Sequence, residues 1–592
     1  MTQSRAVDVF FSCVKQHGPR PAMRYKSQGV WHTITWSEYA EQVKCVAKGM
    51  ISLGVEPRDG VVIIGGNRPE WVIADVAAIF CGAIPAGIYT TNSAEQCRYI
   101  TDHCDATMAV VENAVQLEKF QSIRAQLPKL KHIVVMDAGD ATGDAMTFDA
   151  LIDAGENITD AALDARMNAQ VPSDVCALIY TSGTTGNPKA VMITHEGVSF
   201  VAESLQTLMT LEPSDRLISY LPMSHIAEQA VTIYGPMTVG ASVSFAESVE
   251  KLGDNLREIR PTIFLGVPRV WEKIQSKMQA AASQITGVKK RLATWAKAQG
   301  KAARYRVERG MSPGWRYKLA DKLVFSKVRA KLGLDACRMQ ATAAAPIAMS
   351  TLEYFANLGI PICEVYGMSE CTGPGTVSLP FNFRLGKCGQ VVPGTELRIA
   401  EDGEILMRGK HVFKGYLKDP EATRETLDAD GWLHSGDLGK LDEEGFLQIT
   451  GRKKELIITA GGENISPSMI EGLFQSVTGI GHAMVVGDRK KYLTVLLSLD
   501  PEKLAILAEQ AGSSATILAQ AAVCPKINAF IDEQIKVLNK QLARVQTIKA
   551  FRIAPGEFSI DGGELTATMK LKRNVVLAKY DAMIASMYND DV

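Results

Sequence analysis

Between about residues 60 and 370, short β-branched runs alternate with stretches of helical periodicity. The run "GVVIIGG" (60–66) precedes the helix-like "RPEWVIADVAAIFCG" (68–82). Further strand-like runs are "CALIYTSG", "RLISYLP", "PTIFLGVP" and "RMQATAAA". Strands that alternate with helices form βα units on largely parallel sheets. The alternation therefore predicts an α/β fold built of βα layers.

The pattern changes in the last third of the chain. From about Gly386 to Thr450, short strands with Gly, Asp and Pro turns predict an antiparallel β subdomain. After Gly451, a helix near Pro467–Ser476 and the strand runs "HAMVVGD" and "YLTVLLSLD" predict a small α+β domain. A chain of 592 residues is too long for one core. We therefore expect an N-terminal domain over 1–450, with the antiparallel subdomain at about 386–450, and a mobile C-terminal domain over 451–592.

Composition excludes several classes of protein. The apolar share of 46%, the charged share of 22% and the net charge of -1 are ordinary for a globular protein and predict no nucleic-acid partner. The eleven cysteines form no Cys-x-x-Cys pair and no zinc-type cluster, which favours reduced thiols in a cytoplasm. The first residues lack a secretory signal pattern, and the longest apolar stretch, at about 230–246, is too short to span a bilayer. The oligomeric state, monomer or homodimer, stays open.

One stretch, at about 280–331, departs from this average and predicts a basic helical insert. Its only acidic residues between Val288 and Lys331 are Glu308 and Asp321, and its apolar residues recur at helical spacing. Two interpretations stay open: a solvated helical face, or peripheral attraction to anionic lipid at the inner face of a membrane or to a polyanionic ligand. The basic residues are Lys289, Lys290, Arg291, Lys297, Lys301, Arg304, Arg306, Arg309, Arg316, Lys318, Lys322, Lys327, Arg329 and Lys331.

The loop "YTSGTTGNPK" (180–189) follows the apolar run "VCALIY" and has the composition of a phosphate site. Backbone N–H groups, hydroxyls and a lysine after a strand can surround phosphate oxygens. It is not a Walker A loop, because Gly183 and Gly186 are two residues apart and Lys189 lies between proline and alanine. The mononucleotide fold of P-loop NTPases is therefore disfavoured.

Extended to "YTSGTTGNPKAVMITH", the loop closely resembles the phosphate signature of the adenylate-forming superfamily, which comprises acyl-CoA synthetases, peptide-synthetase adenylation domains and luciferases. Further motifs of that superfamily follow in order across nearly the whole chain: "LPMSHIAEQ", "YGMSECTGP", "GWLHSGDLG", "GRKKELIITAGGENISP" and "ELTATMKLKR". The segments "YGMSECTGP", "FNFRLGKCG" and "ELIITAGGEN" are most similar to long-chain fatty acyl-CoA synthetases of the bubblegum type.

The resemblance implies a two-step ligase that uses ATP, Mg²⁺ and coenzyme A. A carboxylate attacks the α-phosphorus of ATP, pyrophosphate leaves, and a thiol then displaces AMP. Because two anions must meet, positioning and charge neutralisation dominate such a step. The residues expected to bind ATP and AMP are Thr181, Ser182, Gly183, Thr184, Thr185, Gly186, Lys189, Ala344, Tyr366, Gly367, Ser369, Asp437 and Arg452.

Individual roles follow from the same resemblance. Tyr366 is expected to stack on adenine, Ser369 to bond the α-phosphate, and Asp437 to accept the ribose hydroxyls with Arg452 nearby. Glu370 is expected to help hold Mg²⁺, a hard cation that prefers oxygen ligands. His225 is expected near the substrate carboxylate, with a satisfied buried histidine as the alternative; no Gly-x-Ser-x-Gly elbow accompanies it.

The C-terminal motifs imply a moving lobe. Lys570 is expected to bridge the carboxylate and the α-phosphate, although Lys572 has nearly the same spacing and stays an alternative. Lys454 occupies the hinge position, about which the lobe turns after adenylation. The stretch Gly461, Gly462, Glu463 and Asn464 is then expected to line the route of coenzyme A.

The sequence departs from the family pattern beside the acyl pocket. The stretch "TAAAP" (342–346) has Ala343 where glycine is common, so the preferred acyl chain length stays open. The gating residues of the acyl tunnel also stay unassigned. We expect a ligase for long-chain fatty acids. The alternatives are adenylation of a medium-chain or aromatic acid, transfer to a carrier protein, an oxidative luciferase, and a silent acyl- or nucleotide-binding protein.

Overall fold

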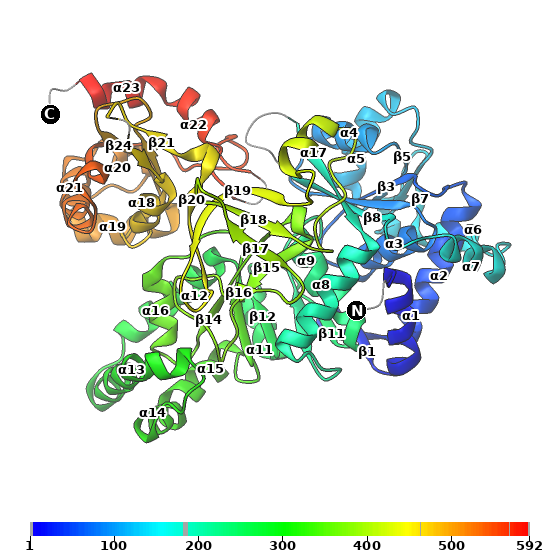
Figure 1. Ribbon diagram of the computed structural model, residues 1–592, viewed down its shortest axis with the longest axis horizontal. Coiled ribbons are helices and arrows are strands. Elements are labelled where there is room, and N and C mark those ends of the chain that lie inside the picture. Colours follow the sequence, from blue (N-terminus) through cyan, green and yellow to red (C-terminus); the bar gives the residue numbers. More distant parts are fainter. Residues whose placement is uncertain (1–3, 182–186, 462, 567–568, 590–592) are drawn as a thin grey trace.

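The computed structural model describes residues 4–181, 187–461, 463–566 and 569–589. A large N-terminal part holds three sheets with helices around them and an antiparallel sheet, and a smaller C-terminal part lies at one end of the molecule (Figure 1). This arrangement confirms the predicted α/β class with an antiparallel β subdomain and a small C-terminal α+β part.

The largest sheet has seven strands. Adjacent strands of this sheet are parallel, except for the last pair, β8 and β9, which is antiparallel. The predicted phosphate loop therefore joins two adjacent strands and not a strand and a helix. The strand order is β7 (Met146–Thr147), β6 (His132–Val135), β5 (Ala106–Val111), β3 (Gly60–Ile64), β4 (Ile84–Ile88), β8 (Val175–Thr181) and β9 (Lys189–Thr194).

Both faces of this sheet are covered by helices, which is why its central strands are apolar throughout. Val61 and Ile63 of β3 point into one core with α2 (Trp36–Ser52) and α3 (Pro69–Phe80). Val62 and Ile64 point into the opposite core with α4 (Ala94–His103) and α5 (Ala114–Ile123). Successive side chains of a strand alternate between faces, so one short apolar run supports two cores.

Two further sheets complete the βα layers. One has the order β10 (Arg216–Ser219), β11 (Ser242–Phe245), β1 (Pro21–Ser27) and β2 (Val30–Thr35). The other has the order β12 (Ile263–Leu265), β13 (Met339–Thr342), β14 (Ile362–Met368), β15 (Gly373–Val377) and β16 (Gln390–Val391). β12 to β14 are parallel, and β14 turns back antiparallel to β15.

The antiparallel sheet contains β17 (Glu396–Ile399), β18 (Glu404–Arg408), β19 (Leu433–Leu441) and β20 (Leu447–Arg452), with α17 (Pro420–Thr426) beside it. Other N-terminal helices are α1 (Ala6–His17), α6 (Phe148–Ala154), α7 (Asp160–Asn168), α8 (His195–Met209), α9 (Ile226–Gln229), α10 (Gly235–Val239), α11 (Leu252–Ile259) and α16 (Met349–Ala356).

The C-terminal lobe, meaning the residues from Leu456 on, has its own buried cores. Its main sheet pairs β23 (Ile480–Val486) antiparallel with β24 (Leu493–Leu499), and β24 parallel with β25 (Ile548–Ile553). A small hairpin joins β21 (Ile457–Ile458) and β22 (Asn464–Ile465). The helices are α18 (Pro467–Phe474), α19 (Leu504–Ala511), α20 (Leu518–Val523), α21 (Pro525–Asn539), α22 (Arg573–Lys579) and α23 (Asp581–Asn589).

The basic stretch forms helices that project from the body, at the lower left of Figure 1. They are α13 (Gly287–Glu308), α14 (Trp315–Ala320), a π-helical turn (Asp321–Phe325) and α15 (Ser326–Leu332), and they follow α12 (Pro268–Ser283). Among the described helices, none combines the length and apolar character needed to cross a bilayer.

Candidate active site

Asp437 lies at the centre of a buried polar contact that joins three strands. The hydroxyl of Tyr366, on β14, donates to Asp437 Oδ2 at 2.9 Å. Arg452 Nε donates to Asp437 Oδ1 at 2.9 Å, because the two residues are register partners on β19 and β20. Asp437 is 8% exposed. Three residues that the sequence predicted for the nucleoside are thus in direct contact.

Glu370 is buried next to a tyrosine that sequence reasoning missed. The hydroxyl of Tyr416 donates to Glu370 Oε1 at 2.7 Å. Burial raises the pKa of Glu370, and this hydrogen bond opposes that rise. The ammonium of Lys189 lies 4.9 Å from the centre of the Tyr416 ring and 3.9 Å from Asp419 Oδ2. Tyr416 therefore connects the predicted magnesium carboxylate with the predicted phosphate lysine.

The turn that carries Ser369 and Glu370 depends on glycine. A Cβ on Gly367 would lie 1.9 Å from the carbonyl oxygen of Gly373, so only glycine lets β14 and β15 approach this closely. The strand register shifts between Tyr366 and Gly367, and Thr372 adopts a φ of +54°. This sharp turn holds Ser369, which is buried, at the end of β14.

His225 caps the short helix α9. Its Nδ1 accepts the backbone N–H of Ala227 at 3.1 Å, so Nδ1 is the unprotonated nitrogen of this ring. Burial lowers the pKa of His225 to about 4, and the charge of Lys570 acts in the same direction. The imidazole is therefore neutral at physiological pH.

Glu228, one turn further on, was not predicted from the sequence. Its Oε1 accepts the hydroxyls of Ser219 and Thr232 at 2.6 and 2.7 Å, and the Asn67 amide at 3.2 Å. Its Oε2 accepts the backbone N–H of Leu221 at 3.2 Å. Burial raises the pKa of Glu228 to about 7 despite these donors. The carboxyl ties the segment of His225 to β10.

Lys570 reaches this site from the C-terminal lobe. Its surroundings lower its pKa, first by loss of hydration and then through the charge of Arg452, whereas Asp437 and Glu370 oppose the shift. The residue keeps solvent-accessible surface, so the loss of hydration is partial. The backbone N–H of Lys572 instead bonds the carbonyl of Glu564, and Lys572 precedes α22. The charges of Asp437 and Glu370 thus reach Lys570, so it lies within electrostatic range of the residues predicted for the ribose and for magnesium.

The predicted phosphate loop is described only at its ends. Thr181 and Lys189 are register partners on β8 and β9, and the Thr181 hydroxyl donates to the Lys189 carbonyl at 3.4 Å. Ser182, Gly183, Thr184, Thr185 and Gly186 lie outside the described residues. Ala344, just after β13, has a φ of +74°, a left-handed conformation that costs a non-glycine residue about 1 kcal/mol.

The residues predicted for the coenzyme A route lie in the C-terminal lobe. Gly461, Glu463 and Asn464 belong to the hairpin of β21 and β22, and Gly462 is outside the described ranges. The described hydrogen bonds of this hairpin join Glu463 to Thr459 within its own turn and Ala460 to Lys490. None of them reaches the residues predicted for the nucleoside. Lys454 is exposed, whereas its neighbour Lys453 forms ion pairs with Asp402 and Glu404 at 2.5 and 3.0 Å.

Within the described ranges, no three His, Cys, Asp or Glu side chains gather as a metal site. The donor chemistry of Glu370 still fits magnesium, because this ion is commonly held by one or two carboxylates together with phosphate oxygens and water.

Comparison with known proteins identifies the family. Residues 10–417 match the model of the AMP-binding enzyme family, and residues 454–592 match that of the AMP-binding enzyme C-terminal domain. The chain is 43% identical to "Long-chain-fatty-acid--CoA ligase ACSBG2" of Xenopus laevis, over 98% of this chain and 83% of that protein. It is 38% identical to "Long-chain-fatty-acid--CoA ligase ACSBG1" of Homo sapiens, over 98% and 85%.

Solved structures support the fold. An anthranilate CoA ligase, AuaEII, in complex with anthranoyl-AMP matches with a TM-score of 0.74 at 21% identity, over 99% of this chain and 100% of that one. ATP-bound MatB from Rhodopseudomonas palustris matches with a TM-score of 0.71 at 21% identity, over 98% and 100%. With both family models matched along nearly its whole length, the chain belongs to the AMP-binding enzyme family, and its relatives are fatty acyl-CoA ligases of the bubblegum type.

Proposed function

We propose that this protein is an ATP-dependent, AMP-forming ligase that converts a long-chain fatty acid to its acyl-CoA thioester. The names of its relatives and the family match support this assignment. One observation supports the mechanism: Asp437, held by Tyr366 and Arg452, and Glu370, held by Tyr416, are buried carboxylates whose charges act on Lys570 of the C-terminal lobe. An active site assembled from two lobes suits a reaction in which different groups are needed at different stages.

In the first half-reaction, a carboxylate oxygen attacks the α-phosphorus of ATP and the bond to pyrophosphate breaks. Asp437 and Arg452 hold the ribose, and the Tyr366 ring lies beside adenine. Lys189, with the loop Thr181–Gly186, binds the β- and γ-phosphates, and Ser369 bonds the α-phosphate. Lys570 neutralises the negative charge shared by the carboxylate and the α-phosphate. The repulsion between these two anions is the largest part of the barrier, so its neutralisation speeds the step.

Magnesium bound at Glu370 would neutralise the departing pyrophosphate. Glu370 must be ionised for this role, and the Tyr416 hydroxyl favours the ionised form. His225 is neutral and its Nδ1 is used by the Ala227 N–H, so Nε2 carries the proton and can donate to the carboxylate of the acid without a competing charge.

In the second half-reaction, the sulfur of coenzyme A attacks the acyl carbonyl and AMP leaves. We propose that the C-terminal lobe turns about Lys454, withdraws Lys570 and brings the hairpin Gly461–Asn464 to the acyl-adenylate. Among the described residues, the hydrogen bonds of this hairpin are all to its own lobe, in keeping with a hairpin that moves together with that lobe. The exposure of Lys454 is in keeping with a hinge.

The proposal includes a cytoplasmic location and attraction of the basic stretch 288–331 to anionic surfaces. Release of AMP, measured with palmitate in the presence and absence of coenzyme A, tests the enzymatic assignment. Coenzyme A–dependent release with palmitate supports it. Activity only with medium-chain or aromatic acids, or only with a carrier protein, would replace the substrate assignment, and no AMP with any acid would favour a silent binding protein. A series of acids of increasing length then defines the chain-length preference.

A further inference from the structure

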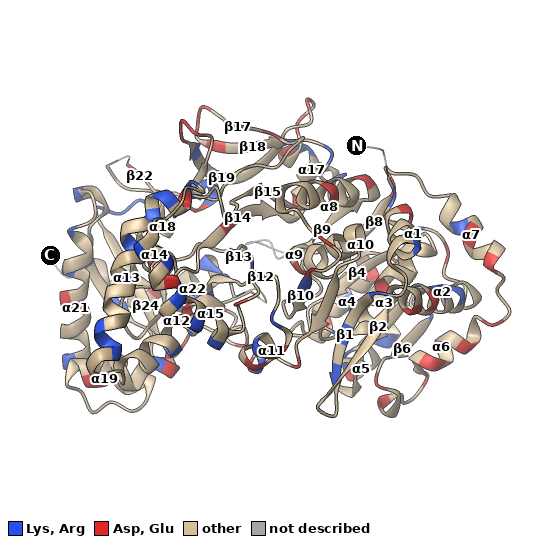
Figure 2. Ribbon diagram, turned by 90° about the horizontal axis from the view of Figure 1, so that it is seen from below, with Lys and Arg blue, Asp and Glu red and all other residues tan. Residues whose placement is uncertain are grey.

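The projecting helices α13 to α15 carry an unbalanced charge. Fourteen basic residues face two acidic ones between Val288 and Lys331, a net charge of +12 in a chain whose total is -1. Within the described residues, ion pairs engage only Arg304, Arg309 and Arg329 of this set. Blue segments recur along these helices in Figure 2. Most of this charge is therefore free to act on something outside the molecule.

The same helices display apolar side chains outward. Trp315, Leu319 and Leu323 follow one another at intervals of four residues and are 70%, 40% and 37% exposed. The opposite side of this segment already has an apolar face, since Ala320 and Phe325 are buried and Tyr317 packs with them. A helix of a globular protein needs one apolar stripe. The second stripe, which faces water, has no role in the core.

Cationic side chains lie next to the outward stripe. Lys318 and Lys322 are exposed and alternate with Leu319 and Leu323 along the chain, and the Arg316 guanidinium lies 5.4 Å from the Trp315 ring. This segment combines exposed apolar residues, including a tryptophan, with neighbouring lysine and arginine. Helices that lie in the interface of an anionic membrane have this composition.

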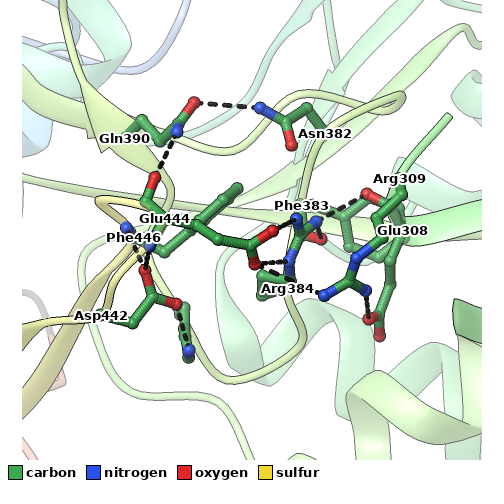
Figure 3. A network of polar contacts seen from close by, with 10 residues as sticks. Glu308, Arg309, Asn382, Phe383, Arg384, Gln390, Asp442, Glu444 and Phe446 are labelled. Atoms are coloured by element: carbon green, nitrogen blue, oxygen red, sulfur yellow. Dashed lines mark hydrogen bonds and ion pairs between the residues drawn. The ribbon is translucent and has the colours of Figure 1, made fainter.

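A polar network holds the base of this projection in place (Figure 3). Arg384 donates to the carbonyl of Glu308 at 3.0 Å and pairs with Glu444 at 2.9 Å. Arg309 pairs with both Glu308 and Glu444, at 3.7 and 3.4 Å. The end of α13 is thus bound to the turn between β19 and β20, so α14 starts from an anchored base.

We propose that α14 and the following π-helical turn, Trp315–Phe325, form an interfacial anchor that inserts Trp315, Leu319 and Leu323 into an anionic phospholipid bilayer. This inference rests on the proposed attraction of the basic stretch to anionic surfaces, and adds to it the element that enters the lipid. A soluble polyanion would use the lysines and arginines and leave the three apolar side chains in water. A bilayer surface uses both sets, since headgroups bind the cations while the acyl region accepts the apolar stripe.

Sedimentation with vesicles tests this proposal. The wild-type protein is expected to bind phosphatidylcholine vesicles that contain phosphatidylglycerol, with a blue shift of its tryptophan emission as Trp315 leaves water, and to bind pure phosphatidylcholine weakly. The triple variant Trp315→Ser, Leu319→Ser, Leu323→Ser is expected to lower the bound-to-free ratio by about tenfold or more, because burial of several apolar side chains is lost. The matched control is Ile506→Ser, Ile517→Ser, Val523→Ser, at positions on the C-terminal lobe that are 50%, 55% and 78% exposed. It is expected to bind vesicles like the wild type.

Two outcomes would overturn the anchor. One is unchanged vesicle binding by the triple variant while Lys318→Glu with Lys322→Glu abolishes binding, which would mean that the attraction is electrostatic only. The other is equal binding of wild type to soluble inorganic polyphosphate and to anionic vesicles in competition. Thermal melting and palmitate-dependent pyrophosphate exchange without vesicles verify that the variants fold. Vesicle binding by a protein that shows no exchange would contradict the proposed function and leave the anchor standing.

Discussion

Arg452 and Asp437 face each other across the hairpin of β19 and β20, with Arg452 Nε donating to Asp437 Oδ1 at 2.9 Å. The second carboxylate oxygen accepts the Tyr366 hydroxyl. A carboxylate has about four acceptor positions, so these two bonds orient Asp437 and leave positions for two vicinal hydroxyls. The carboxylate is thus oriented for ribose before the nucleotide arrives.

The Asp437→Asn variant tests that orientation. Loss of the charged acceptor is expected to reduce kcat/KM for ATP by roughly 10- to 100-fold, the usual cost of a hydrogen bond to a charged group. Initial rates at varied ATP concentration measure the effect. Glu443→Gln, at an exposed position in the turn of the same hairpin, is the control and should leave kcat/KM unchanged. Equal values for wild type and Asp437→Asn would remove Asp437 from the nucleotide site.

Tyr416→Phe should change the pH profile of the enzyme. Burial raises the pKa of Glu370 and the Tyr416 hydroxyl opposes this rise, so activity that needs the carboxylate falls as the pH is lowered through the raised pKa. Without the hydroxyl, the acidic limb moves to higher pH and more Mg²⁺ is needed at a given pH. Profiles of kcat/KM against pH at several Mg²⁺ concentrations measure both changes. Tyr354→Phe, on α16, should keep the wild-type profile. An acidic limb that does not move in Tyr416→Phe would separate Glu370 from magnesium.

Glu228→Gln is expected to alter how stability depends on pH. The folded pKa is about 7 and lies above the unfolded value, so the wild type binds this proton more tightly when folded and loses stability as the pH rises from about 4.5 to 7. Gln does not titrate. The free energy of unfolding of the variant minus that of the wild type should therefore increase between about pH 5 and about pH 8. Urea unfolding at both pH values measures the difference, and a constant difference would mean that Glu228 does not titrate in this range.

Glycine should be tolerated better at Ala344 than at Ala343. Ala344 has a φ of +74°, so glycine relieves a strain of about 1 kcal/mol there, which offsets the roughly 0.5–1 kcal/mol that glycine costs through the added freedom of the unfolded chain. The neighbouring Ala343 has no left-handed φ, so Ala343→Gly is expected to destabilise by roughly that full 0.5–1 kcal/mol, whereas Ala344→Gly should melt close to the wild type. Thermal melts of both variants give the comparison. Equal destabilisation by the two substitutions would contradict the assigned conformation at Ala344.

Much of this architecture could be predicted from local sequence. Apolar runs such as "GVVII" are buried on both faces of a parallel sheet, and the Gly- and Asp-rich stretch after Gly386 forms the antiparallel sheet. Asp437 and Tyr366 could be named because each lies in a short motif that carries its own signature. Their direct contact could not, since 71 residues separate them and only the folded sheets bring them together.

The residues that were missed act through partners distant in sequence. Glu228 looks like an ordinary helical glutamate, and its burial depends partly on Asn67, 161 residues away. Tyr416 becomes informative only when it meets Glu370, 46 residues earlier. In "TAAAP" the sequence drew attention to Ala343, whereas the backbone that favours glycine is at Ala344. The outward stripe of α14 was hidden because its spacing equals that of a buried stripe.

The central claim is that Lys570 serves adenylation and not thioester formation. Both half-reactions are to be measured on Lys570→Ala and on the control Lys572→Ala: palmitate-dependent exchange of labelled pyrophosphate into ATP, and acyl-CoA formation from supplied palmitoyl-adenylate. Lys570→Ala is expected to lose about 100-fold or more of the exchange, the usual cost of one transition-state electrostatic group, and to keep acyl-CoA formation. Lys572→Ala should keep both. Equal loss of both half-reactions in Lys570→Ala, or loss of exchange only in Lys572→Ala, would contradict the account.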